Sequence, residues 1–364
     1  FTNTLLKLLA EYQARPTAGA PAKLLISCRT QYFRTLRDQR NHFTGQERDD
    51  TTAESYRALI LLPLAEDQVT RYIENALPGT DLDRLLEMIR SVHNLTELTQ
   101  RPYTLKLVSE FIPEIEADHL AGRTVQGVSL YRKMARRWLE RDSGKHHIRP
   151  RDKLRLAADL AAHLWRDGGG GLDIHRIENW FHLWLADQPA LAVRYAKIGP
   201  EQLEEDLRTA TFLRREDGDV GSFRFAHTSL QEFFLADYLL EAIRRDRPEL
   251  WTMPLPSRET LDFLGQMLLE DGPHDALSKT MQGWRAPYRE GTSELLLAYA
   301  LRARARGWPM PVLHGIDLRG SDLSGLELGD RAAAPLVLGP ADFRDATLRR
   351  ARFAGVQMDG ADFS

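Results

Sequence analysis

The chain has 364 residues, of which 28% are charged, and its formal net charge at pH 7 is −3. Such a balance creates no overall field for binding nucleic acid or an anionic membrane surface. The single cysteine, Cys28, excludes an internal disulfide framework and a multi-cysteine zinc site, and it fits the reducing conditions of the cytoplasm.

The length of the chain, its apolar runs and its two ends give three further expectations. The length suffices for two or three domains with substantial cores. No apolar run approaches the roughly 20 residues that span a bilayer, so we expect no membrane partner. The chain opens on Phe1 without a targeting pattern, and Ala361–Ser364 stops within a repeat. We therefore expect both ends to lie inside a longer protein.

The first apolar run of interest is Lys23–Ser27 (KLLIS), which is typical of a buried parallel strand. Arg29 follows it, so a permanent positive charge lies at the carboxyl end of a strand, where open α/β sheets bind ligands. An arginine after a strand also suits a surface ion pair. Both interpretations of Arg29 stay open at this point.

Helical periodicity dominates from residue 64 to residue 209. Within this range Pro102 is placed for a helix start or for a rigid turn. Gly168–Gly171 is expected to be a flexible connection. The predicted helices cover residues 64–76, two segments between 81 and 115, and residues 128–142, 153–165, 174–185 and 200–209.

A β-hairpin is predicted next. Thr211–Arg215 and Ser222–Ala226 alternate in hydrophobicity around an Asp-Gly-Asp turn. Three helices followed by a hairpin are typical of a winged helix. Trp180, Phe181 and Trp184 make the 174–185 helix a packing element, and this argues against recognition of DNA.

His227 lies where the hairpin ends and a helix begins. Thr228 with Gln231, or Ser229 with Glu232, has the spacing of a capping box. A histidine in this place is either a structural residue or a contact to a ligand. The helix that follows has an apolar face formed by Leu230, Phe233, Phe234, Tyr238 and Leu239. Further helices are predicted at residues 228–244, 258–269, 274–282 and 292–305.

A period of five residues governs the end of the chain. Most units carry a small residue two positions before the central apolar residue, which lets stacked coils share a narrow core. The period resembles that of the pentapeptide-repeat family, which implies a right-handed square β-helix. Residues 331–340 are expected to be degenerate repeats or a distorted coil. The central positions are 318, 323, 328, 338, 343, 348, 353, 358 and 363.

The front of the chain resembles the C-terminal part of a NACHT-type STAND NTPase. The matches are Lys23–Thr30 (KLLISCRT), residues 95–107 and Phe223–Leu239 (FRFAHTSLQEFFLADYL). The resemblance implies that Arg29 reports the γ-phosphate and that Pro102 packs near the adenine. It also implies that His227 contacts the β-phosphate of ADP. The physical chemistry agrees, because a guanidinium forks onto phosphate oxygens and an imidazole N–H donates to phosphate.

Two parts of that family's site are missing from the sequence. It contains neither a GxxxxGK[ST] phosphate loop nor an acidic Walker B cluster after an apolar strand. We therefore expect no hydrolysis of ATP by this chain alone and no catalytic residue. ADP or ATP with Mg would bind only if a preceding segment supplies the phosphate cradle. Cys28 lacks a histidine partner pattern, and the adjacent pair His146-His147 lacks zinc-ligand spacing.

The predicted fold is multidomain and mainly α. It comprises the end of an α/β P-loop NTPase core (residues 1–62), a helical domain (63–145), a winged-helix domain (146–227), a helical array (228–307) and a right-handed pentapeptide-repeat β-helix (308–364).

The predicted function is an ADP/ATP-gated signalling switch, which the NACHT resemblance connects with bacterial immune or stress sensing and antiviral defence. Its β-helix would be the sensor or interaction surface. Expected partners are a protein or a second copy, bound through the β-helix or the NTPase face. The alternative is a non-enzymatic scaffold whose repeats bind a protein. DNA mimicry is disfavoured, because eight acidic residues face six arginines in residues 316–364.

Overall fold

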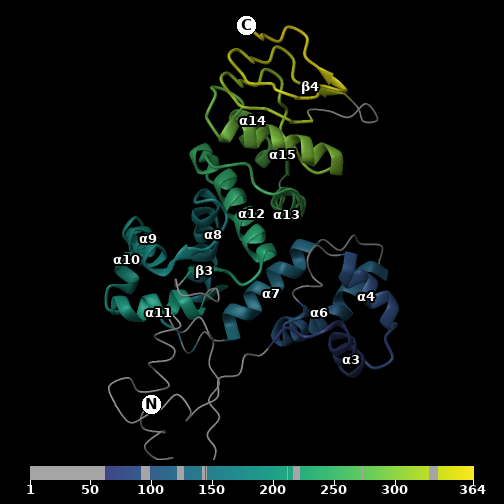
Figure 1. The fold of residues 1–364 in the computed structure, drawn as a ribbon, viewed down its shortest axis with the longest axis vertical. Coiled ribbons are helices and arrows are strands. Elements are labelled where there is room, and N and C mark those ends of the chain that lie inside the picture. Colours follow the sequence, from purple (N-terminus) through teal and green to yellow (C-terminus); the bar gives the residue numbers. More distant parts are fainter. Residues whose placement is uncertain are drawn as a thin grey trace, which may run out of the picture. The chain divides into compact units, whose positions relative to one another are not determined.

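The computed structural model describes residues 62–91, 99–120, 127–141, 144, 146–210, 212–215, 222–272, 274–327 and 335–364. Over these residues the chain is mainly helical and ends in a coil of short parallel strands, as Figure 1 shows. The predicted strand Lys23–Ser27 and Arg29 lie outside the described residues. In the part of the chain that the structure describes, no helix is long and apolar enough to cross a membrane.

The predicted helices are confirmed wherever they fall within the described residues. The structure adds the short helix α10, the 3-10 helix η4 and the strand β1, which periodicity did not predict. The helices are α3 (Glu66–Ala76), α4 (Leu82–Ser91), α6 (Pro102–Leu120), α7 (Gly127–Arg141), α8 (Pro150–Arg166), α9 (Ile174–Ala186), α10 (Pro189–Tyr195), α11 (Pro200–Ala210), α12 (Thr228–Arg244), η4 (Pro248–Trp251), α13 (Arg258–Glu270), α14 (His274–Gly283) and α15 (Thr292–Arg306). The strands are β1 (Leu172–Asp173), β2 (Leu213–Arg215), β3 (Ser222–Phe225), β4 (Leu336–Val337) and β5 (Val356–Gln357).

The described chain forms two compact units. The first unit contains α9, α10, α11 and an antiparallel sheet with strand order β1-β3-β2. Leu213 pairs with Phe225 and Leu172 with Phe223, so the predicted hairpin is confirmed. The boundaries of the five predicted domains stay predictions.

Helix α12 is the centre of the second unit. It packs against α8 and α13, and also contacts α7, α14 and η4. The predicted apolar face is buried, and Leu235, Ala236 and Leu240 on its other sides are buried as well. An amphipathic pattern is typical of a surface helix, whereas a helix that is apolar on every side lies inside the protein. Helix α12 is close to the second type, because within it only Thr228, Asp237, Glu241 and Arg244 are not buried.

The last part of the second unit is a parallel β-helix. Asp317 pairs with Asp342, which is 25 residues further along, and Asp342 pairs with Asp362, which is 20 residues further along. A coil of 20 residues has four sides of five residues each. Leu336 pairs with Val356 at the 20-residue distance, whereas Glu327 pairs with Arg352 at 25. The first coil is therefore five residues longer, and the addition lies between Glu327 and Leu336.

The corners of the coil recur every fifth residue. At each corner the backbone adopts a left-handed conformation, which glycine allows without strain. Asp345 and Arg350 take the same conformation at a cost of about 1 kcal/mol each. Pro340 occupies the next corner position, but its ring forbids a positive φ. The preceding residue, Gly339, adopts the left-handed conformation in its place. The corner residues are Gly315, Gly320, Gly325, Asp345, Arg350, Gly355 and Gly360.

The inward position of the repeat is confirmed at the start of the β-helix. Leu318, Leu323, Leu338 and Phe343 are buried. Exposure then rises along the coil, and Phe363 is 50% exposed. Its ring stacks on Phe343 with centroids 4.9 Å apart, so the aromatic residues continue the core column.

One close approach fixes the segment that leads into the β-helix. Gly265, in the middle of α13, lies under the ring of Trp308, and a Cβ atom at Gly265 would come within 2.1 Å of that ring. No other residue type fits here without movement of the indole. Trp308 directly follows Gly307, which ends α15 in the left-handed conformation.

We expect Gly265→Ala to destabilise the second unit by about 1–3 kcal/mol, because overpacking of the indole outweighs the better helix propensity of alanine. Thermal or urea unfolding measures the change. Gly283→Ala is the matched control, since a Cβ atom there meets nothing within 4 Å. Equal stability of the two variants would contradict the proposed packing.

Candidate functional site

His227 is the N-cap of α12 and directly follows β3 and Ala226. Its backbone is extended (φ −149°, ψ 141°), and its Nδ1 accepts a hydrogen bond from the backbone N–H of Ser229 at 3.1 Å. The ring is half-buried. The imidazole therefore satisfies one of the backbone donors that every helix leaves free at its start.

The predicted capping box is wrong. Ser229 does not cap the helix, because its hydroxyl lies 2.7 Å from His227 Nδ1 and accepts a hydrogen bond from Tyr131 Oη at 2.8 Å. The carboxylate of Glu232 accepts a hydrogen bond from Ser257 at the start of α13 instead. Because α12 begins at Thr228, its N-cap is His227 and neither Thr228 nor Ser229.

Tyr131 brings α7 to this site. Its side chain and that of Ser229 are fully buried. The phenol ring stacks near Phe233 of α12 with centroids 5.7 Å apart, and meets the edge of Phe263 of α13 at 4.9 Å. The next residue, Arg132, forms ion pairs with Glu270 and Asp271 at the end of α13. Helices α7, α12 and α13 thus hold the histidine network together.

The other two predicted site residues are not brought to His227 by the described contacts. Pro102 is exposed and is the first residue of α6, where its missing N–H costs nothing. Its helix-start interpretation matches this position. Arg29 lies outside the described residues. The structure thus gives a hydrogen-bonded setting to His227 alone among the three.

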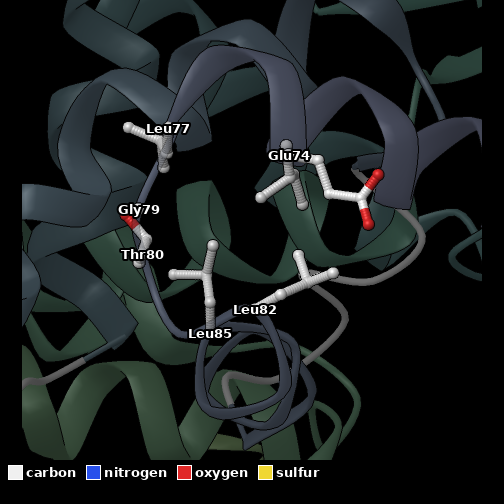
Figure 2. A pocket seen from close by; sticks show the side chains of 7 residues that line it. Glu74, Leu77, Gly79, Thr80, Leu82 and Leu85 are labelled. Atoms are coloured by element: carbon white, nitrogen blue, oxygen red, sulfur yellow. The ribbon is translucent and has the colours of Figure 1, made fainter.

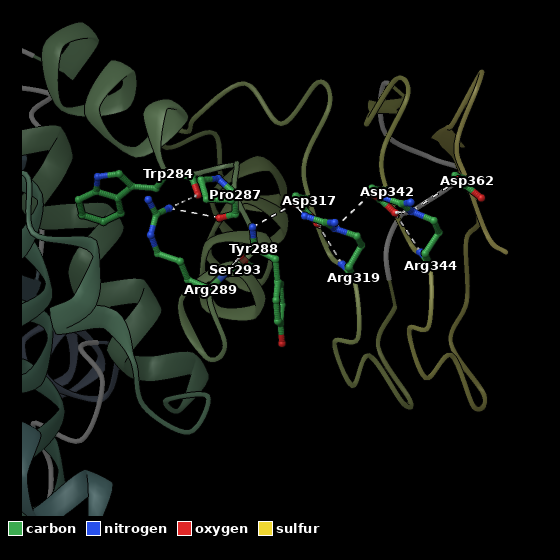
Figure 3. A network of polar contacts seen from close by, with 10 residues as sticks. All are labelled: Trp284, Pro287, Tyr288, Arg289, Ser293, Asp317, Arg319, Asp342, Arg344 and Asp362. Atoms are coloured by element: carbon green, nitrogen blue, oxygen red, sulfur yellow. Dashed lines mark hydrogen bonds and ion pairs between the residues drawn. The ribbon is translucent and has the colours of Figure 1, made fainter.

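A second candidate site is a ladder of aspartates and arginines along one side of the β-helix, which Figure 3 shows. Arg319 binds Asp317 with its Nε and Nη2 at 3.0 and 2.8 Å, and its Nε lies 3.3 Å from Asp342. Arg344 repeats this pattern with Asp342 (2.9 and 2.6 Å) and reaches Asp362 at 3.6 Å. Each arginine therefore joins two successive coils.

The ladder explains why aspartate recurs before the central residue of a repeat. Asp322 accepts the backbone N–H of Ser324 at 3.0 Å, and Asp342 accepts that of Arg344 at 3.1 Å. A carboxylate in this place thus satisfies a corner N–H and attracts an arginine in the same geometry. In the sequence the ladder is visible as the repeated pattern Asp-x-Arg at residues 317–319 and 342–344. That these two triplets lie on neighbouring coils follows only from the pairing of Asp317 with Asp342.

The helical array continues the ladder beyond Asp317, at the left of Figure 3. The backbone N–H of Asp317 donates to Arg285 O at 2.8 Å, and the carboxylate of Asp317 accepts the N–H of Tyr288 at 3.1 Å. Between coils, the N–H of Asp342 donates to Ile316 O in the same manner. The loop between α14 and α15 is therefore paired to the first coil as a further rung, so the β-helix is attached to the array along an edge.

The hydrogen bonds also change the acidity of the ladder. The side-chain bond from Arg319 lowers the pKa of Asp317, and that from Arg344 lowers the pKa of Asp342. The N–H of Ser364 lowers the pKa of Asp362. A carboxyl group with a lowered pKa in the folded state stabilises the fold above its ordinary pKa, and this contribution is lost as pH falls.

The pocket in Figure 2 has about 300 Å³ and lies between α3 and α4. It is lined by Leu77, Leu82, Leu85 and Glu74 and by no basic side chain, so it does not suit a nucleotide phosphate. A further pocket has about 490 Å³ and is lined by α14, with His274 and Lys279, and by residues 307–312. No group of histidine, cysteine and acidic residues that could hold a metal ion occurs in the described part of the chain.

Comparisons with known proteins bear on the end of the chain. The family model described as pentapeptide repeats (8 copies) matches residues 339–364. The C-terminal segment therefore carries pentapeptide repeats, as the period of five predicted. No NACHT or NTPase family model matches the chain, and no curated protein matches it.

We expect acid to weaken the β-helix, because protonation of Asp317, Asp342 and Asp362 removes the ladder as pH falls below about 4. Hydrogen exchange measures this as lost protection of amides between coils, such as that of Leu318, which donates to Asp342 O. Protection should be full at pH 6.

Asp342→Asn provides the sharper form of this test. The amide retains an oxygen for the N–H of Arg344 but carries no charge, so protection should fall at pH 6 and depend less on pH. Asp359→Asn is the control, since Asp359 is exposed and lies outside the ladder. An acid response unchanged in Asp342→Asn would contradict the role of the ladder.

Proposed function

We propose that this chain is the regulatory part of a nucleotide-gated signalling switch of NACHT/STAND type. Its helical region carries a residue that reports bound ADP, and its β-helix is the sensor or interaction surface. The observation that carries the proposal is His227. This imidazole is held at the start of the buried helix α12 by hydrogen bonds to Ser229.

The setting of His227 supports binding of a phosphate. A helix N-terminus has partial positive charge, and an imidazole N–H adds a directed donor beside it. The order of α8, α9, α11 and the β2–β3 hairpin agrees with the predicted winged helix, whose last strand precedes the histidine in the chain. ADP bound to His227 would favour one arrangement of the protein, and ATP another.

The chemistry of the chain favours a sensing role. The sequence lacks the phosphate loop and the Walker B acids, so its residues would report a nucleotide that a preceding segment holds, and would not hydrolyse it. Arg29 and Pro102 keep their predicted roles at the γ-phosphate and the adenine. Mg would accompany ATP where a phosphate loop is present.

A second candidate function is a scaffold that binds a protein partner without nucleotide control. The pairing of Arg285 and Tyr288 with Asp317 favours it, because this pairing joins the β-helix and the helical array into one extended frame. The two functions differ in one observable. A switch gives different limited-proteolysis patterns with ADP and with a non-hydrolysable ATP analogue, whereas a scaffold gives one pattern.

We expect His227→Ala to release ADP from the protein expressed in the full length that its gene encodes. A hydrogen bond to a charged group contributes about 1.5–3 kcal/mol, so ADP affinity should fall about 10- to 150-fold. Nucleotide retained after gel filtration and the dissociation rate of a fluorescent ADP measure this.

The control is His175→Ala, which removes an exposed histidine of α9. It should retain ADP as the unchanged protein does. The proposal fails if the unchanged protein binds no ADP, or if His227→Ala retains ADP as well as His175→Ala does.

A further inference from the structure

The pocket of about 490 Å³ lies where the helical array leads into the β-helix. One wall is α14, and the other is the segment of residues 307–312 that joins α15 to the first coil. Leu269 in the last turn of α13 completes the lining. All of these elements belong to the second unit. The volume falls within the range of about 300–1,000 Å³ that small-molecule sites occupy.

The wall formed by residues 307–312 is apolar and is held in place from behind. Trp308 lies on Gly265 of α13, and its backbone N–H donates to Ala303 O at 2.9 Å. The carbonyl of Pro309 accepts a hydrogen bond from the buried hydroxyl of Tyr299 at 2.6 Å. This wall is therefore a fixed apolar surface. Its lining side chains are those of Trp308, Pro309, Met310 and Val312.

The wall formed by α14 is polar, and its lining residues form one stripe along the helix. The stripe consists of His274, Asp275, Ser278, Lys279 and Gln282. Within the part of the chain that the structure describes, the side chains of the last four make no hydrogen bond and no ion pair. Their donors and acceptors are therefore available to a ligand, and the hydroxyl and the carboxamide among them can both donate and accept.

Two residues of the stripe carry opposite charges. Asp275 and Lys279 are one turn apart, so their Cβ atoms are about 5–6 Å from each other, and both side chains are exposed. A ligand with a single charge is attracted by one of them and repelled by the other. A ligand that carries an ammonium and a carboxylate close together is attracted by both. Charge complementarity thus favours a zwitterion of the α-amino-acid type.

His274 limits the pocket at one edge and has a structural partner. Its Nδ1 lies 2.5 Å from Leu268 O in the last turn of α13, where carbonyls lack helical partners. A carbonyl only accepts, so Nδ1 carries the proton. In the neutral ring Nε2 then presents a lone pair. Such an acceptor suits a ligand ammonium beside Asp275, and it does not suit a phosphate oxygen.

We propose that this pocket binds an α-amino acid with an apolar side chain. Asp275 and His274 receive the ammonium, and Lys279 and Ser278 receive the carboxylate. The side chain of the ligand lies against the apolar wall at Trp308. The site uses neither His227 nor a nucleotide, so it goes beyond the proposed nucleotide switch.

The pocket is connected to the attachment of the β-helix. Gln282 O accepts hydrogen bonds from the backbone N–H and the Nη1 of Arg285. Arg285 in turn accepts the N–H of Asp317 and donates from Nε to His314 O at 3.1 Å. The apolar wall leads along the chain to His314 as well. A ligand that contacts both walls would therefore stabilise this attachment, and its role as a sensed signal rests on the proposed function.

Calorimetric titration of the full chain tests the ligand class. The probes are L-phenylalanine, L-leucine and L-methionine, which sample the size of the side chain. Phenylalanine amide lacks the carboxylate, and 3-phenylpropionate lacks the ammonium. Each analogue should bind about 3- to 10-fold more weakly than L-phenylalanine, because it loses a charge-assisted contact at a partly exposed site. Equal binding of L-phenylalanine and both analogues, or no binding of any of the three amino acids at millimolar concentration, would overturn the proposal.

Variants of the two exposed charges locate the ligand. Lys279→Gln should weaken L-phenylalanine about 3- to 10-fold and leave phenylalanine amide unchanged, whereas Asp275→Asn should weaken L-phenylalanine and leave 3-phenylpropionate unchanged. Thr280→Ala is the matched control, since Thr280 does not line the pocket and its hydroxyl donates to Ala276 O within α14. Losses in the two charge variants no larger than in Thr280→Ala would overturn the placement of the ligand.

Hydrogen exchange tests the connection with the β-helix. Bound L-phenylalanine should increase protection of the Asp317 amide, which donates to Arg285 O. Binding without this change would overturn the connection and support the ligand site alone. ADP retention by the full-length gene product is measured separately. Loss of ADP binding with L-phenylalanine binding intact would overturn the proposed switch, whereas the reverse result would overturn the amino-acid site.

Discussion

Burial of most of α12 is the constraint on which the second unit depends. A helix with apolar residues on several sides must be largely enclosed, and α7, α8, α13, α14 and η4 pack against it. Ser229, Leu230 and Gln231 of its first turn are buried, so their backbone donors need partners within the protein. The cap at His227, the hydroxyl of Ser229 and the phenol of Tyr131 all follow from this requirement. Structural support and a directed donor are therefore two results of one arrangement.

The β-helix is stabilised differently from the helices around α12. Its core is too narrow for large side chains on both inward positions, and its order comes from backbone pairing between coils together with the Asp–Arg ladder. Surface ion pairs contribute little singly. Here each arginine bridges two coils and each aspartate also holds a corner N–H, so every member of the ladder is fixed by two partners.

Much of this fold could be predicted from the sequence, because long helices and a period of five are local patterns. Helix α10 was missed because it has only seven residues, and β1 because two residues carry no period. The position of His227 between a hairpin and a helix could likewise be predicted from the neighbouring residues. Its partner Tyr131 lies 98 residues from Ser229, and no spacing rule reaches that far.

Competition for side chains also limited the prediction. The capping box of Ser229 and Glu232 was a sound local pattern, but Ser257 of a different helix holds the carboxylate. In the β-helix the period of five predicted which residues point inward. It did not predict that Arg319 pairs with Asp342 of the next coil. That pairing depends on the number of residues in a coil, which the repeat unit alone leaves open.

The five additional residues of the first coil have a consequence for how this protein tolerates change. One side of the square coil is five residues long, so an addition of that length leaves the inward positions and the stacked partners as they were. Doubling the length of a flexible loop costs only about 0.6 kcal/mol in closure entropy. The stretch of sequence that joins Glu327 to Leu336 is therefore a natural insertion point, where a recognition loop or an engineered epitope can be added without a change in the pairing of the coils.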